Sequence, residues 1–162
     1  MYIKRNLNER LTVFKSLRFP YKSNFSSSHR FRVVIGIGGN IGDVKRRFEH
    51  LFFEIKRDKR VYLEESSLIL KNPPFGYVNQ DDFFNSILVL KTSMQPRYFL
   101  DFLMRMEKKF GRRRSFANAP RTLDLDIIFF DNRVIKTSKL TIPHASWQTR
   151  ESVLIPLLGL KR

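Results

Sequence analysis

Residues 33–40 of this chain read VVIGIGGN, and the fold can be worked out from this stretch. Its first five positions are apolar and mostly β-branched, which is typical of a buried strand, and the Gly-Gly-Asn that follows ends the strand. Beyond it, Phe48, Leu51 and Ile55 recur at the spacing of one helix face, which predicts a helix over residues 43–57. The core therefore begins with a strand that leads directly into a helix.

The rest of the chain continues this alternation of strands and helices. Residues 61–70 and 83–90 read as strands, and two prolines indicate a loop over 72–76 between them. A second helix is expected over residues 96–110, because proline favours a first turn and a glycine follows as a stop. Residues 123–130 form the last predicted strand, and the Asp-Asn after it suits a hairpin turn.

The resulting order is strand, helix, strand, strand, helix, strand. This order is typical of an α+β protein with a ferredoxin-like antiparallel sheet, a βαββαβ core and helices packed on one face. A chain of 162 residues suits one such domain. The fold by itself implies no activity, since this architecture serves many functions.

The first 32 residues differ in composition from the rest, with eight Lys or Arg against one Glu. We therefore expect a basic N-terminal extension, residues 1–32, followed by the functional domain, residues 33–162. Within the extension, Leu11, Phe14 and Leu17 lie three residues apart, a spacing that predicts a short amphipathic helix.

Charge and cysteine content limit the kinds of site and ligand. The 31 Lys and Arg against 15 Asp and Glu give a formal charge of +16, which favours polyanions but does not choose among nucleotides, nucleic acid and anionic lipid. The absence of cysteine excludes disulfides, thiolate zinc sites and cysteine nucleophiles, and it fits a reducing compartment. No apolar run reaches the roughly 20 residues that span a bilayer, and no secretory signal is recognisable. We therefore expect a cytoplasmic protein that does not act at a membrane.

The most informative segment for chemistry is PRTLDLDIIFF, residues 120–130. Alternate side chains of a strand share a face, so Asp124 and Asp126 should point together, and Arg121 stands just upstream of them. Two carboxylates this close repel each other unless a cation lies between them, and Mg²⁺ suits such a pair together with phosphate oxygens. An exposed acidic edge strand would show the same spacing, so spacing alone leaves both interpretations open.

Four segments resemble motifs of the 6-hydroxymethyl-7,8-dihydropterin pyrophosphokinase family, enzymes of folate biosynthesis. The segment PRTLDLDI, residues 120–127, resembles the family signature, and GGNIGD at 38–43 resembles its first strand-to-helix turn. PPFG followed by DFFN, within residues 73–85, resembles the pterin-binding loop and strand, and residues 142–157 resemble the C-terminal motif. The resemblance implies Mg²⁺-dependent transfer of pyrophosphate from ATP to 6-hydroxymethyl-7,8-dihydropterin, with release of AMP.

The same resemblance implies a role for individual residues. The catalytic positions, of which the two aspartates would hold two Mg²⁺ ions, are Arg112, Arg121, Asp124 and Asp126. The positions that match ATP contacts are Glu107, Arg114, Ile127, Lys139, Thr141, His144 and Arg150. The positions that match pterin contacts are Asn72, Pro74, Phe75, Phe83 and Asn85. The implied partners are ATP and the pterin, without nucleic acid, and we expect a monomer.

Two positions depart from the family pattern. Ser152 stands where an aromatic residue usually stacks on the pterin, so Trp147 is a candidate for that role. Asn118 stands where the loop over the nucleotide usually carries a tryptophan. Many relatives also continue further at the C-terminus, and we hypothesise that residues 1–32 pack in the place of that segment.

Two other functions are compatible with parts of the sequence. An RNA-binding sheet is permitted by the fold, the charge and the aromatic content, but no Lys/Arg-Gly-Phe/Tyr-Gly/Ala-Phe stretch is present, and two aspartates on one strand face repel phosphate unless a metal is bound. Residues 36–42 nearly match a dinucleotide-binding fingerprint, but the third glycine comes one position late and the parallel strand context is lacking.

Overall fold

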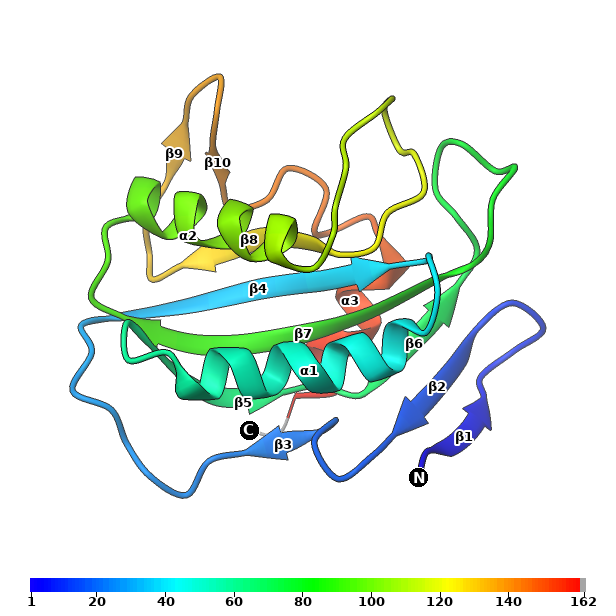
Figure 1. Cartoon of the computed structure of the whole chain (residues 1–162), viewed down its shortest axis with the longest axis horizontal. Helices are drawn as coiled ribbons and strands as arrows, with labels where there is room; N and C mark the ends of the chain where they lie inside the picture. Colours follow the sequence, from blue (N-terminus) through cyan, green and yellow to red (C-terminus); the bar gives the residue numbers. More distant parts are fainter. Residues whose placement is uncertain (161–162) are drawn as a thin grey trace.

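The computed structural model describes residues 1–160, which form a mixed α+β fold around one antiparallel sheet (Figure 1). The sheet has eight strands: Ile3–Asn6 (β1), Thr12–Lys15 (β2), Tyr21–Lys22 (β3), Phe31–Gly39 (β4), Val61–Ser66 (β5), Ile69–Asn72 (β6), Phe83–Thr92 (β7) and Asp124–Phe130 (β8). A separate hairpin pairs Ile135–Lys136 (β9) with Thr141–Ile142 (β10). The helices are Val44–Arg57 (α1), Pro96–Lys109 (α2) and Glu151–Leu158 (α3).

The centre of the sheet has the predicted ferredoxin-like order. Strand β4 lies between β7 and β8, and β5 pairs with the other edge of β7, so the order across the core is β8, β4, β7, β5. Helix α1 follows β4 and α2 follows β7, and both lie over the same face of the sheet (Figure 1). The prediction of an α+β fold with a βαββαβ core is confirmed.

Helix α1 shows why these segments become helices. Asp43 caps it, because its Oδ1 accepts a hydrogen bond from the backbone N–H of Arg46 at 3.2 Å. Its apolar stripe, which includes Phe48, Leu51 and Ile55, is fully buried against the sheet. Truncating Phe48 to alanine would cost about 3–5 kcal/mol, because the interior would keep most of the resulting cavity.

The opposite face of the sheet is covered by α3, a helix that we did not predict. Val153 of α3 packs with Val34, Ile87 and Ile128 in a second apolar cluster. Proline inside a helix removes a backbone donor, and Pro156 hid this helix in the sequence. The expectation of helices on one face therefore holds for α1 and α2 only.

The extension is part of the sheet, and its predicted helix is wrong. Residues 12–15 form β2, which pairs with β6, and residues 21–22 form β3, which pairs with β5. Leu17, which would have faced the core in a helix, is 82% exposed. The backbone of β2 gains ladder hydrogen bonds along the edge of β6, and this outweighs a weak helical spacing.

Two smaller predictions also need correction. The strand expected over residues 61–70 is two strands, β5 and β6, and both pair with β7. The turn at Asp131 does not make a hairpin with β8, because the strand after it, β9, pairs with β10 instead. Among residues 1–160, no helix is long and apolar enough to cross a membrane.

Candidate active site

The two aspartates of strand β8 lie beside glycines of the adjacent strand β4. In the register with β4, Asp124 lies opposite Gly38 and Asp126 lies opposite Gly36. The residues that alternate with them, Leu123, Leu125 and Ile127, are at most 5% exposed and face the helices. The predicted alternation is therefore present, with both carboxylates on the other face of the sheet.

The aspartates open into a cleft of about 450 Å³. Its other walls are the segment 112–121 and Arg150, at the start of α3. The Asp126 side chain keeps 45% of its surface exposed in this cleft, whereas that of Asp124 keeps 23%. The cleft thus combines two carboxylates with several guanidinium groups.

Asp124 is neutralised by two arginines. Arg112 Nη1 donates to Asp124 Oδ1 at 2.7 Å and to Glu107 Oε2 at 2.5 Å. Arg121 Nη1 donates to Asp124 Oδ2 at 3.2 Å. Glu107 comes from α2, is 4% exposed and also accepts the backbone N–H of Leu125 at 2.8 Å. Four of the predicted catalytic and ATP residues, Glu107, Arg112, Arg121 and Asp124, therefore form one connected network.

Asp126 is the least compensated acid in the cleft. Although 45% of its side-chain surface stays exposed, its partial enclosure by the protein raises its pKa above the ordinary aspartate value, and the nearby charges of Asp124 and Glu107 raise it further. Burial likewise raises the pKa of Glu107. For Arg112, burial alone would lower the pKa, but the carboxylates of Asp124 and Glu107 outweigh it and raise the pKa. An ionised Asp126 is therefore costly unless another cation approaches.

The donor set suits Mg²⁺. This ion takes one or two carboxylates and keeps water and phosphate oxygens in the rest of its shell. Asp126 is open to the cleft, and Asp124 already attracts two cationic side chains. Within residues 1–160 no three His, Cys, Asp or Glu side chains converge on one point, so a metal here would share its shell with oxygens of the ligand.

His144 faces the carboxylates from the segment before α3. Its backbone N–H donates to the carbonyl of Ile128 at 2.9 Å, and its Nδ1 accepts the N–H of Ser146 at 3.1 Å. Nε2 therefore carries the proton in the neutral ring, and it lies 4.0 Å from Asp126 Oδ2. Burial lowers the pKa of His144, and Arg150 lowers it further.

The remaining predicted ATP positions are less closely grouped. Arg114 reaches Glu107 Oε1 at 3.3 Å, while 65% of its side chain is exposed. The Ile127 side chain packs in the core, on the face away from the cleft. Lys139 and Thr141 are exposed on the β9–β10 hairpin and do not line the cleft.

The predicted pterin residues meet at the neighbouring ends of β6 and β7. Asn85 Nδ2 donates to Asn72 Oδ1 at 2.7 Å, and Asn72 Nδ2 donates to the carbonyl of Pro73 at 2.9 Å. Phe83 begins β7, and the Arg121 guanidinium lies 5.2 Å from its ring centroid. Arg121 therefore connects the aspartates with the pterin residues.

The loop that contains Pro74 and Phe75 reaches over to α3. Phe75 is 65% exposed, and the Arg150 guanidinium lies 4.6 Å from its ring centroid. Pro74 is half-buried in the same loop. Trp147, the candidate replacement for the missing aromatic, packs instead against Phe129 with ring centroids 5.0 Å apart, in the cluster under α3.

Asn40, in the motif GGNIGD, has no predicted role. It connects the two loops that flank the site, residues 73–82 and residues 112–121. Its Nδ2 donates to Gln80 Oε1 at 2.8 Å and to the carbonyl of Asp81 at 3.0 Å, while its Oδ1 accepts the N–H of Arg121 at 2.9 Å. A Cβ at the preceding Gly39 would lie 2.6 Å from the carbonyl of Thr122, so only glycine allows this approach. The Gly-Gly-Asn sequence after a strand is the signal that could have pointed to it.

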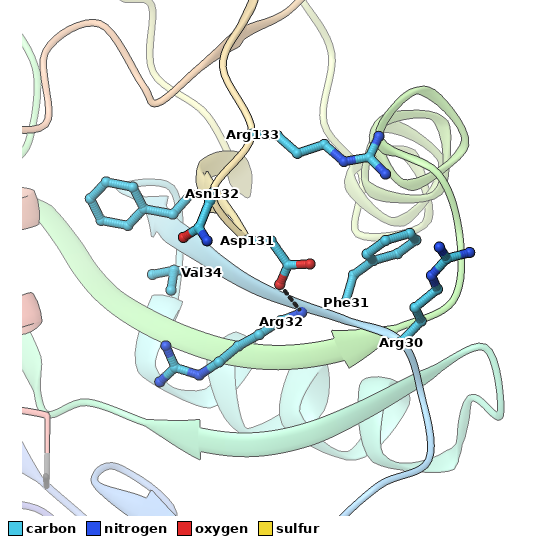
Figure 2. Close-up of a pocket in the computed structure, with 8 residues that line it drawn as sticks. Arg30, Phe31, Arg32, Val34, Asp131, Asn132 and Arg133 are labelled. Carbon is cyan, nitrogen blue, oxygen red and sulfur yellow. Dashed lines mark hydrogen bonds between the residues drawn. The ribbon is translucent and has the colours of Figure 1, made fainter.

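A second and larger cavity, of about 720 Å³, lies beside the start of β4 and the end of β8 (Figure 2). It is lined by Arg30, Arg32, Arg133 and apolar residues, and its single carboxylate, Asp131, accepts the backbone N–H of Arg32 at 2.8 Å. None of the predicted site residues lines it. The smaller cleft, which holds the paired carboxylates, is therefore the candidate active site.

Comparison of the sequence with those of known proteins shows to which family this chain belongs. The family model described as 7,8-dihydro-6-hydroxymethylpterin-pyrophosphokinase matches residues 34–162, which is most of the chain. The chain belongs to this family. A 2-amino-4-hydroxy-6-hydroxymethyldihydropteridine pyrophosphokinase of Helicobacter pylori is 40% identical over 146 residues, which cover 89% of this chain and 86% of the relative.

Further relatives of this pyrophosphokinase family agree. One from Campylobacter jejuni, with the same name as that of H. pylori, is 39% identical over 143 residues, covering 88% of this chain and 91% of its own length. A folic acid synthesis protein of Dictyostelium discoideum is 34% identical over 136 residues, covering 83% of this chain and 20% of its own length. Membership of the pyrophosphokinase family confirms the resemblance drawn from the four motifs.

Proposed function

We propose that this chain transfers the terminal pyrophosphoryl group of ATP to 6-hydroxymethyl-7,8-dihydropterin in folate biosynthesis, with two Mg²⁺ ions held by Asp124 and Asp126. The observation that carries the proposal is the pair of carboxylates on one face of β8, at the floor of an arginine-lined cleft and beside the Asn72–Asn85 amide pair. Metal, polyphosphate and pterin can then meet at one place.

ATP is the co-substrate of this family, and the arginines of the cleft are suited to its phosphates. Arg112 and Arg121 both contact Asp124, so an incoming Mg²⁺ and phosphate would compete for these partners and draw the guanidinium groups onto phosphate oxygens. Arg150 Nε is buried and has no hydrogen-bond partner among residues 1–160, which leaves it available to a ligand oxygen. Mg²⁺ bound at the aspartates would supply charge neutralisation of the polyphosphate.

The pterin would bind at the ends of β6 and β7. Asn72 and Asn85 each combine a donor and an acceptor, which the polar edge of a pterin requires. Phe83 offers a face for the flat ring, but Arg121 covers that ring in the ligand-free protein. Pterin binding would therefore move Arg121 from Phe83 towards the phosphates.

The reaction is an in-line displacement at phosphorus. The hydroxymethyl oxygen of the pterin attacks the β-phosphorus, and the bond from that phosphorus to the oxygen bridging to the α-phosphate breaks. AMP leaves with the bonding electron pair, and the hydroxyl proton passes to solvent. Positioning and charge neutralisation by Arg112 and Arg121 would do most of the work, as in other phosphoryl transfers.

Other aspects of the proposal concern the setting of the reaction. We infer a monomer that works in the cytoplasm and has no nucleic-acid partner. The carboxylates, the arginines of the cleft and the Asn72–Asn85 pair all come from one chain, which supports the monomer. The carboxylates at the floor of the cleft, which repel nucleic-acid phosphates in the absence of metal, argue against such a partner.

The decisive experiment measures AMP formed from ATP and Mg²⁺, with and without 6-hydroxymethyl-7,8-dihydropterin. We expect one AMP per pterin consumed, none without pterin, and none when EDTA replaces Mg²⁺. Asp131→Asn, a variant remote from the cleft, should behave like wild type, whereas Asp126→Ala should form no product. Pterin-independent AMP release, or no AMP from a folded sample, would reject the proposed reaction.

A further inference from the structure

The N-terminal extension touches the strand that would carry the pterin edge. Strand β2 runs antiparallel along β6, with Thr12 opposite Lys71 and Val13 opposite Leu70, and β6 ends one residue later at Asn72. On its other side β6 pairs with β7, where Leu70 lies opposite Asn85. Without β2, β6 would be an edge strand held from one side only, as Figure 1 makes clear.

An apolar cluster joins the extension to both walls of the candidate pterin site. Leu11 and Val13 are each 4% exposed and pack with Leu70, which is fully buried. Ile155 of α3 completes the cluster, and α3 begins directly after Arg150. The same few side chains therefore pack against the strand that ends at Asn72 and against Ile155 in the middle of α3.

The start of β2 is itself fixed by local hydrogen bonds. Asn8 Oδ1 accepts the backbone N–H groups of Arg10 and Leu11, each at 2.8 Å, and the N–H of Leu7 donates to the carbonyl of Leu11 at 2.8 Å. This turn places Leu11 at the entry of β2 with little freedom to shift.

The opposite face of β2 contacts β7 directly. The Phe14 ring lies 5.8 Å from the ring of Phe84, which stands between Phe83 and Asn85 in the sequence. Lys45 of α1 lies over both rings, at 4.1 Å from the Phe14 centroid and 5.6 Å from the Phe84 centroid. Strand β2 therefore contacts the pterin-bearing strands from both of its faces.

We propose that Leu11, Val13 and Phe14 are positioning residues for the pterin: they fix the ends of β6 and β7 so that the Asn72–Asn85 pair meets the substrate in one geometry. The inference rests on the proposed function, and it gives the extension a part in substrate recognition. Among residues 1–160, the apolar cluster that holds Leu11 and Val13 includes no side chain of β8 or α2, the elements that carry Glu107, Asp124 and Asp126.

The test compares two buried positions within the extension. Val13→Ala loosens the cluster under β6, whereas the matched control Phe19→Leu alters a fully buried ring that packs on Phe48 and Phe52 of α1, away from the pterin strands. Both variants should lower the midpoint of thermal unfolding. Only Val13→Ala should raise the pterin KM and the equilibrium Kd for the pterin, by about five- to tenfold, below the roughly hundredfold effect of a 1 Å displacement.

Three further measurements make the test specific. The KM for ATP should stay within about twofold of wild type in both variants, since an error in positioning at β6 leaves the other substrate unaffected. Val13→Ile keeps an apolar, β-branched side chain in the cluster, so it should leave the pterin Kd within about twofold of wild type. Leu11→Val is a milder change of the same cluster, and it replaces Val13→Ala if that variant does not fold; its pterin Kd should rise by about two- to threefold.

The outcomes separate this inference from the proposed function. An active wild-type protein together with an unchanged pterin Kd in Val13→Ala and Leu11→Val would overturn the inference alone. Equal rises of the pterin Kd in Val13→Ala and Phe19→Leu would also overturn it, because general destabilisation would then be the cause. A wild-type protein that binds no pterin would overturn the inference and the proposed function together.

Discussion

Among the carboxylates of the cleft, Asp126 has the weakest compensation. Both oxygens of Asp124 accept arginine donors, whereas the one basic side chain within 4.0 Å of the Asp126 carboxylate, among residues 1–160, is the neutral ring of His144. Burial, followed by the charges of Asp124 and Glu107, raises the Asp126 pKa. An ionised Asp126 lowers the stability of the ligand-free protein, and its side chain remains open to the cleft. Both properties are expected of a residue whose compensating positive charge comes from a bound ligand.

Asp126→Asn should stabilise the metal-free protein at pH 8 and lower kcat by about a hundredfold or more. The pKa of Asp126 is higher in the folded than in the unfolded protein, so wild type loses stability as the pH rises through the folded-state pKa. Asparagine does not ionise, so above that pH the Asp126→Asn variant is more stable than wild type. This difference in stability should vanish at pH 4, near the ordinary aspartate pKa. Thermal unfolding of both proteins at pH 8 and pH 4 checks the prediction, since each kcal/mol of stability shifts the melting temperature by about 2–4 °C.

The same variant also tests metal binding. Mg²⁺ should raise the melting temperature of wild type and have little effect on Asp126→Asn, because a ligand that binds only the folded state stabilises it. Asn79→Asp, which adds a carboxylate at an exposed site outside the cleft, serves as the control. A lower melting temperature of Asp126→Asn at pH 8 without metal would contradict the argument.

For individual residues, the sequence predicts those features of the site that depend only on neighbouring residues in the chain. Strand alternation alone placed Asp124 and Asp126 on one face with Leu125 in the core, and the structure has this arrangement. Asn40 lies 81 positions from its partner Arg121, and their contact follows from the register of β4 with β8, which no local pattern reveals. The contacts of the remaining predicted side chains with ligands stay predictions.

At the scale of elements, strong periodicity was predictive and weak periodicity was not. The buried stripes of α1 and α2 span four turns each, so their helices were placed within one or two residues. The three residues that suggested a helix near Leu11 lie instead in and around β2, because pairing with β6 decides their conformation. Helix α3 forms despite Pro156, since packing on Val34 and Ile87 stabilises it.

The two loops that flank the site, residues 73–82 and residues 112–121, contact each other through few side chains. We therefore expect that little free energy holds them together. The rings of Tyr77 and Phe116 lie 5.1 Å apart edge to face, and Gln80 Nε2 donates to the carbonyl of Asn118 at 2.8 Å. Such an aromatic pair contributes about 0.5–1.5 kcal/mol. The segment that carries Arg112 should therefore open locally far more often than the sheet unfolds.

Phe116→Ala should increase this opening without changing global stability by more than about 1 kcal/mol, because the Phe116 side chain is 56% exposed. Trypsin should then cut after Arg113 or Arg114 several-fold faster than in wild type, and Mg²⁺ with an ATP analogue should slow the cut. Phe25→Ala, an exposed aromatic outside both loops, is the control. Equal cleavage rates in Phe116→Ala and wild type would show that the ring contact does not restrain the loop.

At the scale of the whole molecule, the net charge of +16 is spread widely, but the cleft itself also carries an excess of positive charge that can act on a polyphosphate. Five arginines and two aspartates line the cleft, so its potential is positive before any metal binds. A field of this sign raises the local concentration of anionic substrates and is screened by salt. The basic residues of β1 and β2, by contrast, lie at the end of the sheet opposite β8. There the buried apolar side chains of β2 contribute more to stability than the charges do.

Two deletions test whether the extension belongs to the folding unit, although the family model begins only at residue 34. Removal of residues 1–6 takes away β1, whose four residues are all exposed, and should lower the melting temperature by a few degrees at most. Removal of residues 1–24 exposes the edges of β5 and β6 and deletes four buried apolar side chains, Leu11, Val13, Phe14 and Phe19. At about 1.5–3 kcal/mol each, their loss is comparable to the whole stability of a domain, about 5–15 kcal/mol, so cooperative unfolding should disappear. Calorimetry of both deletions decides the matter, since a 25–162 fragment that melts cooperatively near the wild-type temperature would mean that the sheet is complete without the extension.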